Sequence, residues 1–145
     1  METSRFSETY TPPGRTRAWT RKTVIIAGNY KIQCCPFPEV DNELDYICKM
    51  AKQYIKNWRN PFATASWIHL LLARCHPFND GNGRTTRLIA SIPLMMHGYP
   101  PISIGLTQRS DYYNGINKVY DGDHGPLIQC ILRGMEATIA SVRSI

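Results

Sequence analysis

Twelve consecutive residues, HPFNDGNGRTTR from His76 to Arg87, bring together a base, an acid, two glycines and two arginines. His76 is the side chain here whose ordinary pKa, about 6.5, suits removal of a proton at neutral pH. Arg84 and Arg87 lie three residues apart and would share one face of a helix. Because the guanidinium fork matches phosphate oxygens, this spacing predicts chemistry at a phosphate group.

The glycines and the acid suit the same kind of ligand. Gly81 and Gly83 flank Asn82, where the backbone can approach a ligand closely. A helix that opens there offers unpaired N–H groups at its positive end. Asp80 can hold Mg²⁺ brought in by a polyphosphate. Each residue alone also fits a structural role, as a satisfied histidine, a turn aspartate or a solvated arginine, but packing leaves their concentration unexplained.

Helices must position this segment, and the hydrophobic pattern predicts them on both sides. The Asn60-Pro61 pair predicts the N-cap and first residue of a buried helix that runs to about Cys75. A second helix is expected over 82–97, ended by Gly98 and kinked or shifted by Pro93. The motif would then form the loop between two helices and the start of the second.

Further helices and one pair of strands complete the expected fold. Apolar residues recur at helical spacing in three stretches, 40–58, 107–120 and 126–143. The β-favouring stretches 24–27 and 30–34 flank Gly28-Asn29, a two-residue turn signal, so a β-hairpin is expected. The predicted fold class is all-α, with one β-hairpin near the amino terminus.

Composition places the chain among ordinary folded domains. It has 145 residues, 43% of them hydrophobic and 19% charged, which argues against disorder. The sequence contains no apolar run near the ~20 residues of a membrane-spanning helix and no signal-peptide core. The five cysteines show no disulfide or zinc spacing. An intracellular, most often cytoplasmic, location is therefore expected.

The net charge of +6 is concentrated near the amino terminus. Residues 1–31 carry six Lys and Arg against Glu2 and Glu8. We expect a basic arm over 1–20 and one domain over 21–145. The arm either meets nucleic acid or another polyanion, or is a solvated tail.

The motif matches every fixed position of the Fic family signature, H-x-F-x-[D/E]-G-N-G-R-x-x-R. The flanking stretches ATASWIHLLLARCHPF and MMHGYPPISIGLTQRSDYYN also resemble the animal-type Fic adenylyltransferases, and the resemblance covers roughly residues 14–143. It implies an α-helical Fic core with a β-hairpin flap. It also implies transfer of AMP from ATP to a Ser, Thr or Tyr hydroxyl of a protein, with release of pyrophosphate.

The resemblance implies a role for each charged residue of the motif. His76 is expected to deprotonate the attacking hydroxyl, and Asp80 to hold Mg²⁺ between the α- and β-phosphates. Arg84 and Arg87 are expected to bind the β- and γ-phosphates, with Arg87 at the far end. ATP and Mg²⁺ are therefore the expected co-substrate and cofactor.

The remaining nucleotide contacts are implied in the same way. Asn82, with the backbone of Gly81 and Gly83, is expected to cradle the phosphates. Tyr112 and Tyr113 correspond to aromatic positions of the nucleotide pocket, or else belong to the core. Tyr120 stands where animal-type relatives commonly have Asn near the nucleotide, which leaves the nucleotide preference open.

The flap is expected to meet the protein substrate. Tyr30, Lys31 and Ile32 are candidates for contact with a target that adds as a strand, and the alternative is a small edge hairpin packed on the helices. Relatives modify Hsp70-type chaperones, small GTPases or themselves, and many dimerise. The target and a homodimer both stay open.

Two alternatives and one expected absence complete the prediction. The chain could instead transfer a γ-phosphate or UMP, or be a non-catalytic module that binds phosphate or nucleic acid. In many Fic proteins an inhibitory helix, [S/T]-x-x-x-E-[G/N], pairs its Glu with the second motif arginine, here Arg87. No glutamate of this chain precedes Gly or Asn, and only Glu8 follows a Ser or Thr, Ser4, by four residues. We therefore expect an AMP transferase without an intrinsic inhibitory helix and with little AMP-removing activity.

Overall fold

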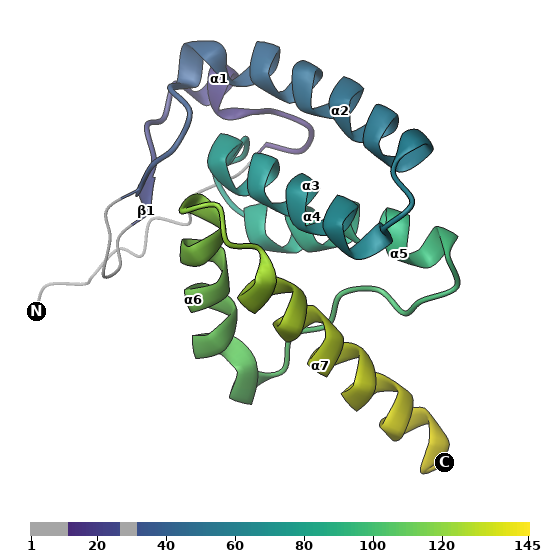
Figure 1. The fold of residues 1–145 in the computed structure, drawn as a ribbon. Coiled ribbons are helices and arrows are strands. Elements are labelled where there is room, and N and C mark those ends of the chain that lie inside the picture. The colour runs from purple at the N-terminus through teal and green to yellow at the C-terminus, as the bar shows by residue number, and fades with distance from the viewer. Residues whose placement is uncertain (1–11, 27–31) are drawn as a thin grey trace, which may run out of the picture.

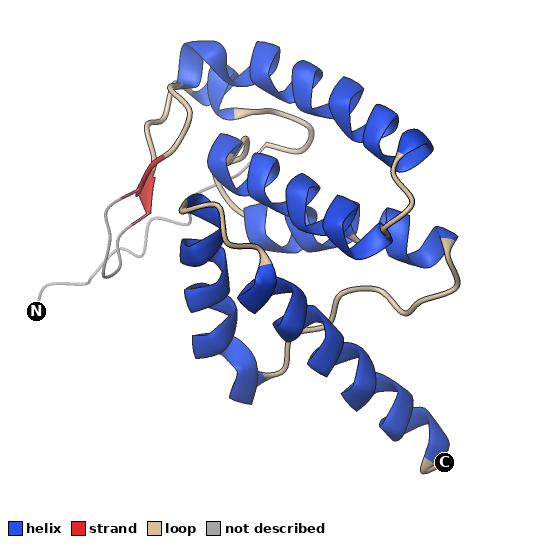
Figure 2. Ribbon diagram, in the orientation of Figure 1, coloured by secondary structure: helices blue, strands red, loops and turns tan. Residues whose placement is uncertain are grey.

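The computed structural model describes residues 12–26 and 32–145, and these are mostly helical (Figures 1 and 2). In chain order the helices are α1 (Arg17–Thr20), α2 (Val40–Asn57), α3 (Pro61–Cys75), α4 (Asn82–Ala90), α5 (Ile92–Met96), α6 (Arg109–Tyr120) and α7 (Gly125–Arg143). Short 3₁₀ turns, η1 (Phe37–Glu39) and η2 (Leu106–Gln108), precede α2 and α6. The predicted helical fold is confirmed. No helix in the described ranges combines the length and apolarity needed to cross a membrane.

The predicted flap is not seen as a full hairpin. Two residues of each expected stretch are strand, β1 (Ile25–Ile26) and β2 (Ile32–Gln33), and they pair antiparallel with Ile25 opposite Gln33. The expected turn at Gly28-Asn29 lies outside the described residues.

Helix α3 is the central element and contacts α2, α4, α5, α6 and α7. It begins as predicted, because the Asn60 side chain accepts hydrogen bonds from the N–H groups of Phe62 and Ala63 at 3.0 and 3.2 Å. Its middle is buried on several sides, with Ile68 and Ala65 fully buried. The core around this helix fixes the place where α3 ends and the motif loop begins.

The helix predicted over 82–97 is divided in two. α4 ends at Ala90, and Pro93 lies in the first turn of α5, so the expected change of direction occurs just before the proline. Buried Ser91 joins the pieces, since its hydroxyl donates to the Arg87 carbonyl at 2.6 Å and accepts from the Ile102 N–H at 2.9 Å. Ser91 thereby ties α4 to the segment that leads to α6.

Helices α6 and α7 pack against each other at close range (Figure 1). A Cβ atom at Gly115 would lie 3.0 Å from the backbone of Leu127, so the glycine permits this approach. Helix α6 is therefore supported along its length by α7 and is not a single exposed helix.

The amino-terminal segment differs from the expected arm. Residues 17–20 of the predicted basic arm form the short helix α1. Arg17, in this helix, is fully buried. A basic stretch without hydrophobic periodicity looks solvated in sequence, but this arginine finds its partners on segments distant in the chain.

Candidate active site

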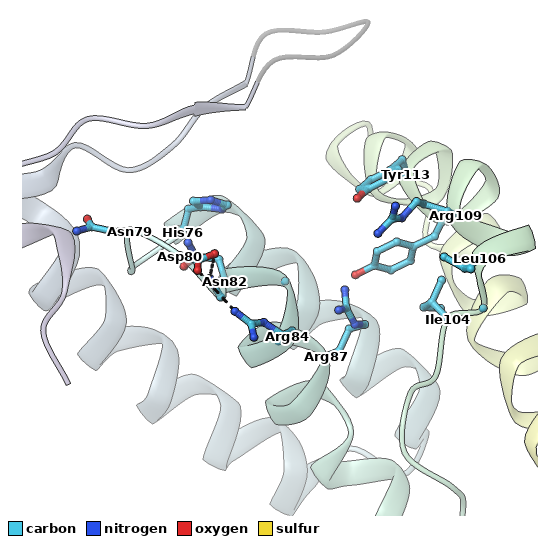
Figure 3. A pocket seen from close by; sticks show the side chains of 14 residues that line it. His76, Asn79, Asp80, Asn82, Arg84, Arg87, Ile104, Leu106, Arg109 and Tyr113 are labelled. Carbon is cyan, nitrogen blue, oxygen red and sulfur yellow. Dashed lines mark hydrogen bonds and ion pairs between the residues drawn. The ribbon is translucent and has the colours of Figure 1, made fainter. Parts of the chain in front are cut away.

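A cleft of about 560 Å³ opens between the motif segment and the start of α6 (Figure 3). It is lined by every predicted residue of the motif and by residues from two later segments. The lining residues are His76, Asn79, Asp80, Gly81, Asn82, Gly83, Arg84, Arg87, Ile104, Gly105, Leu106, Arg109, Tyr112 and Tyr113. We call the His76–Arg87 side the motif wall and the side from Ile104 to Tyr113 the α6 wall.

His76 stands at the point where α3 ends. Its backbone is left-handed, at φ 47°, and its N–H donates to the Leu72 carbonyl at 2.9 Å as the C-cap of the helix. The side chain is half-buried. Burial, and after it the positive charge of Arg17, lower the pKa of His76 below its ordinary value. The imidazole is therefore neutral, and able to accept a proton, at neutral pH.

The start of α4 offers main-chain groups that suit an anion. Gly81 is the N-cap residue, at φ 78°, and no side chain in the described ranges forms a capping hydrogen bond. The first N–H groups of a helix have no acceptor within it and lie at its positive end. Cβ atoms at Gly81 and Gly83 would lie 3.3 Å from the guanidinium groups of Arg84 and Arg87, respectively. The glycines therefore let both arginines fold back along this end of the helix.

Asn82 has a more specific role than the sequence indicated. Its side chain is buried, and its amide accepts from the Phe78 N–H at 2.9 Å and donates to the Phe78 carbonyl at 2.7 Å. Both ends of the amide are thus engaged by the loop backbone. The side chain shapes the loop, and the main chain of Asn82 is the part available to a phosphate.

Asp80 is the exposed carboxylate of the motif wall. One oxygen accepts from the Gly81 N–H at 2.7 Å, and the other lies 3.7 Å from the Arg84 guanidinium, with 77% of the Asp80 side chain accessible. The described residues contain no cluster of three or more potential metal ligands. Mg²⁺ commonly binds to one or two carboxylates together with substrate phosphates, so a single exposed Asp beside an anion site fits this ion.

Arg87 reaches across the cleft to the α6 wall. Its guanidinium carbon lies 5.7 Å from the centre of the Tyr112 ring, and the Tyr112 hydroxyl lies 2.6 Å from Nε2 of His69. Tyr112 and His69 are both buried. Burial raises the pKa of Tyr112, and the hydrogen bond and charge of Arg87 oppose that rise. The two predicted aromatic positions therefore differ, because Tyr112 supports Arg87 whereas Tyr113 is 55% exposed at the cleft.

His69 was not singled out by the sequence analysis. It is 2% exposed on α3, and burial, followed by the charge of Arg87, lowers its pKa to about 4. A signal did exist, because a histidine in a helix that is apolar on all sides must find a hydrogen-bond partner inside the protein.

Arg109 is a second addition to the predicted site. It is the first residue of α6, and it lines the cleft with Ile104 and Leu106, opposite Arg84 and Arg87 (Figure 3). Arginines in an ordinary amphipathic helix are usually solvated, so the sequence carried no local signal for this one.

The remaining predicted residues lie apart from the cleft lining or outside the described chain. Tyr120 packs on Arg74, with the guanidinium carbon 5.2 Å from its ring centre, and is not among the cleft-lining residues. Burial raises its pKa to about 12. Tyr30 and Lys31 lie outside the described residues, and Ile32 pairs with Ile26 in the strand ladder.

Comparison with known sequences gives a family and several relatives. The sequence model of the Fic/DOC family matches residues 4–94. The chain is 42% identical to the protein adenylyltransferase Fic of Nematostella vectensis over 80 residues, which are 55% of this chain and 19% of that protein. For the protein adenylyltransferase Fic of Drosophila virilis, the identity is 38% over 95 residues, 60% of this chain and 20% of that protein. The chain thus spans a small part of the length of these relatives.

Solved structures share the fold. Fic-1 from C. elegans superimposes with a TM-score of 0.64 at 29% identity, over 73% of this chain and 32% of that one. A Fic domain containing signaling protein from Bacteroides thetaiotaomicron gives a TM-score of 0.76 at 22% identity, over 94% and 58% of the two chains. At that lower identity the likeness concerns the fold alone.

Proposed function

We propose that this chain, which belongs to the Fic/DOC family, transfers AMP from ATP to a Ser, Thr or Tyr hydroxyl of a protein. The observation that carries the proposal is the motif wall. A half-buried His76 with a lowered pKa stands in one cleft with an uncapped helix start and two arginines. That combination supplies a base and an anion site within reach of one ligand.

The reaction follows from these groups. The acceptor hydroxyl oxygen attacks the α-phosphorus of ATP, and the bond between the α-phosphorus and the bridging oxygen to the β-phosphate breaks. Neutral His76 takes the hydroxyl proton, and pyrophosphate leaves with the bridging oxygen. The lowered pKa supports this role, because an imidazolium could not accept the proton.

The rest of the motif wall would bind and neutralise the phosphates. The N–H groups at the start of α4 face anions by virtue of the helix dipole, and Arg84 and Arg87 add donors on the same side. In transfer reactions of this kind catalysis consists mostly of positioning and charge stabilisation, so these groups carry most of the rate enhancement. We assign the γ-phosphate to Arg87, whose guanidinium is held at the Tyr112 ring.

Asp80 would hold Mg²⁺ that arrives with ATP. The ion, when bound, would neutralise phosphate charge as the pyrophosphate separates. The high exposure of Asp80 and its position next to Gly81 support this assignment, since both leave the carboxylate open to a ligand at the helix start.

The α6 wall would receive the nucleoside. Ile104, Leu106 and Tyr113 give this side apolar and aromatic surface next to Arg109, which suits a purine and its sugar. Tyr120 lies away from this lining, so we expect its difference from animal-type relatives to affect nucleotide choice little.

The protein substrate would approach along the β1–β2 pair. We assign target contact to Tyr30, Lys31 and Ile32, by analogy with the family's flap, through strand addition. The candidate acceptors are an Hsp70-type chaperone, a small GTPase or the chain itself, and a homodimer remains a prediction.

The test uses ATP labelled at either the α- or the γ-phosphate, with Mg²⁺ and each candidate acceptor. AMP transfer places the α-label on protein and leaves the γ-label in pyrophosphate. Label from the γ-position on protein would instead show a kinase. Label from neither position, together with binding of DNA or RNA that weakens steeply with salt, would show a binding module.

A further inference from the structure

Arg17 is a buried charged side chain that forms no ion pair with a carboxylate of the described residues. It is 0% exposed, and none of the ion pairs among the described residues includes it. A buried charge is costly unless hydrogen bonds satisfy it. The guanidinium must therefore be stabilised by hydrogen bonds inside the protein.

Among the described residues, the acceptors of the guanidinium are main-chain carbonyl oxygens. Nε and both Nη atoms donate to four of them, at 2.6, 2.9, 2.6 and 3.0 Å, on His76, Lys22, Cys35 and Cys75, respectively. The Arg17 backbone N–H also donates to the Pro77 carbonyl at 2.7 Å. Two of these acceptors lie at the C-terminal end of α3, where a positive charge is favourable.

These bonds hold the backbone of His76 in an uncommon conformation. A non-glycine residue seldom adopts a positive φ, such as the 47° of His76, and keeps it where its surroundings determine it. The carbonyls of Cys75, His76 and Pro77 are all bound by Arg17, so the backbone that carries the imidazole has little freedom to turn.

The same guanidinium also reaches the base of the strand pair. One Nη atom binds both Cys75 of α3 and Cys35, two residues beyond β2. The Cys35 N–H in turn donates to the Arg74 carbonyl at 3.1 Å. A second side chain of α1 also binds the motif loop: the Thr20 hydroxyl donates to the Asn79 amide oxygen at 2.8 Å.

We propose that Arg17 is a positioning residue that fixes the His76 backbone and the base of the β1–β2 pair in one arrangement. This inference rests on the proposed function, in which the strand pair presents the hydroxyl that His76 deprotonates. Arg17 itself touches neither ATP nor the acceptor. Its loss would misplace the base relative to the hydroxyl while leaving the phosphate site at α4 intact.

The test compares Arg17→Gln and Arg17→Lys with Arg21→Gln, which removes an equal charge from an exposed neighbour. Misplacement of a reacting group by about 1 Å can cost about 100-fold, so Arg17→Gln should lower kcat by about that factor. The calorimetric affinity for ATP should stay within about twofold, and KM for ATP should follow it. Arg17→Lys, which keeps one charged donor, should recover part of kcat, and Arg21→Gln should match wild type.

Hydrogen exchange without ATP separates this inference from the proposed function. Exchange in Arg17→Gln should accelerate over 72–83 and 32–36 but not over 125–143, even if wild type transfers no AMP. If circular dichroism shows that this variant does not fold, Thr20→Val replaces it, with a smaller loss of kcat at unchanged ATP affinity. Unchanged kcat in a folded variant of an active enzyme, unchanged exchange over 72–83, or a parallel loss of kcat and ATP affinity would overturn the proposal.

Discussion

The two walls of the cleft are built in opposite ways. The motif wall carries its charges on one continuous stretch, and the side chains of Asp80 and Arg84 are largely exposed. The α6 wall presents apolar and aromatic groups, and its key residue, Tyr112, depends on buried His69 from another helix. The residues of the motif wall are therefore specified by local sequence, apart from the backbone of His76, which distant Arg17 holds, whereas the α6 wall exists only once distant helices pack.

The two walls therefore differ in what determines them: the motif wall provides the reacting groups, and the α6 wall must be placed at the correct distance from them. The phosphate-binding groups can be concentrated in a short loop, because a helix end and two glycines aim them, whereas the backbone of His76 is also held by Arg17. The opposing surface must lie at the correct distance across the cleft, and close packing such as that at Gly115 sets this distance. Variants of the motif wall should accordingly affect the reaction, and variants behind the α6 wall should affect stability and nucleotide affinity.

The largest expected effect comes from His76→Ala on the motif wall. Loss of a general base costs about 10²–10⁴-fold, so AMP transfer should fall by that range while the affinity for ATP changes little. The assay is transfer of α-label beside calorimetry with ATP. The exposed histidine variant His97→Ala is the matched control and should behave as wild type. Transfer within tenfold of wild type would remove His76 from the mechanism.

Behind the α6 wall, His69 should make stability depend on pH. Its pKa is about 4 in the fold and about 6.5 when unfolded, so between these values the unfolded state binds more protons. Stability should therefore fall as the pH drops from about 6.5 to about 4, by roughly 3 kcal/mol from this group. His69→Gln, which can still bond Tyr112, should show a flatter profile in urea unfolding.

The control for that experiment is His97→Gln, which removes an exposed histidine and leaves the buried His69–Tyr112 pair in place. Identical slopes for wild type and His69→Gln would mean that His69 does not remain neutral in the fold. That result would contradict the claim that the α6 wall depends on a buried, neutral His69.

Arg87 links the two walls and should show an intermediate effect. Hydrogen bonds to charged groups contribute about 1.5–3 kcal/mol, so Arg87→Ala should weaken ATP binding about 10- to 100-fold. Binding of AMP should weaken less, because the assigned partner of Arg87 is the terminal phosphate. Calorimetry with both nucleotides measures this difference, and an equal loss for the two would place Arg87 elsewhere in the site.

The smallest effect is expected from Glu8→Gly. Glu8, which lies outside the described residues, is the glutamate that half-matches the inhibitory pattern. In the described part of the chain no carboxylate forms an ion pair with Arg87. Transfer should therefore stay near the wild-type rate, and wild type should release little AMP from a modified acceptor. A large rise in transfer, or brisk AMP release, would identify Glu8 as inhibitory.

Sequence alone predicted much of the fold and nearly all of the motif wall. Asn60 and Pro93 are local signals, and both act where expected, as an N-cap and beside a helix break. Arg17 could not be predicted in the same way, because its four carbonyl acceptors meet only in the folded chain. Of the flap, the described residues show the antiparallel pair with Ile25 opposite Gln33, and the expected turn at Gly28-Asn29 lies outside them.

The most direct test of the central claim is to identify the products of one reaction. Wild-type protein, ATP, Mg²⁺ and an acceptor protein are followed by phosphorus NMR, with His76→Ala in parallel. The account predicts pyrophosphate in amounts equal to AMP bound on the acceptor, and neither product with His76→Ala. Formation of ADP with a phosphorylated acceptor, or undiminished pyrophosphate release by His76→Ala, would contradict it.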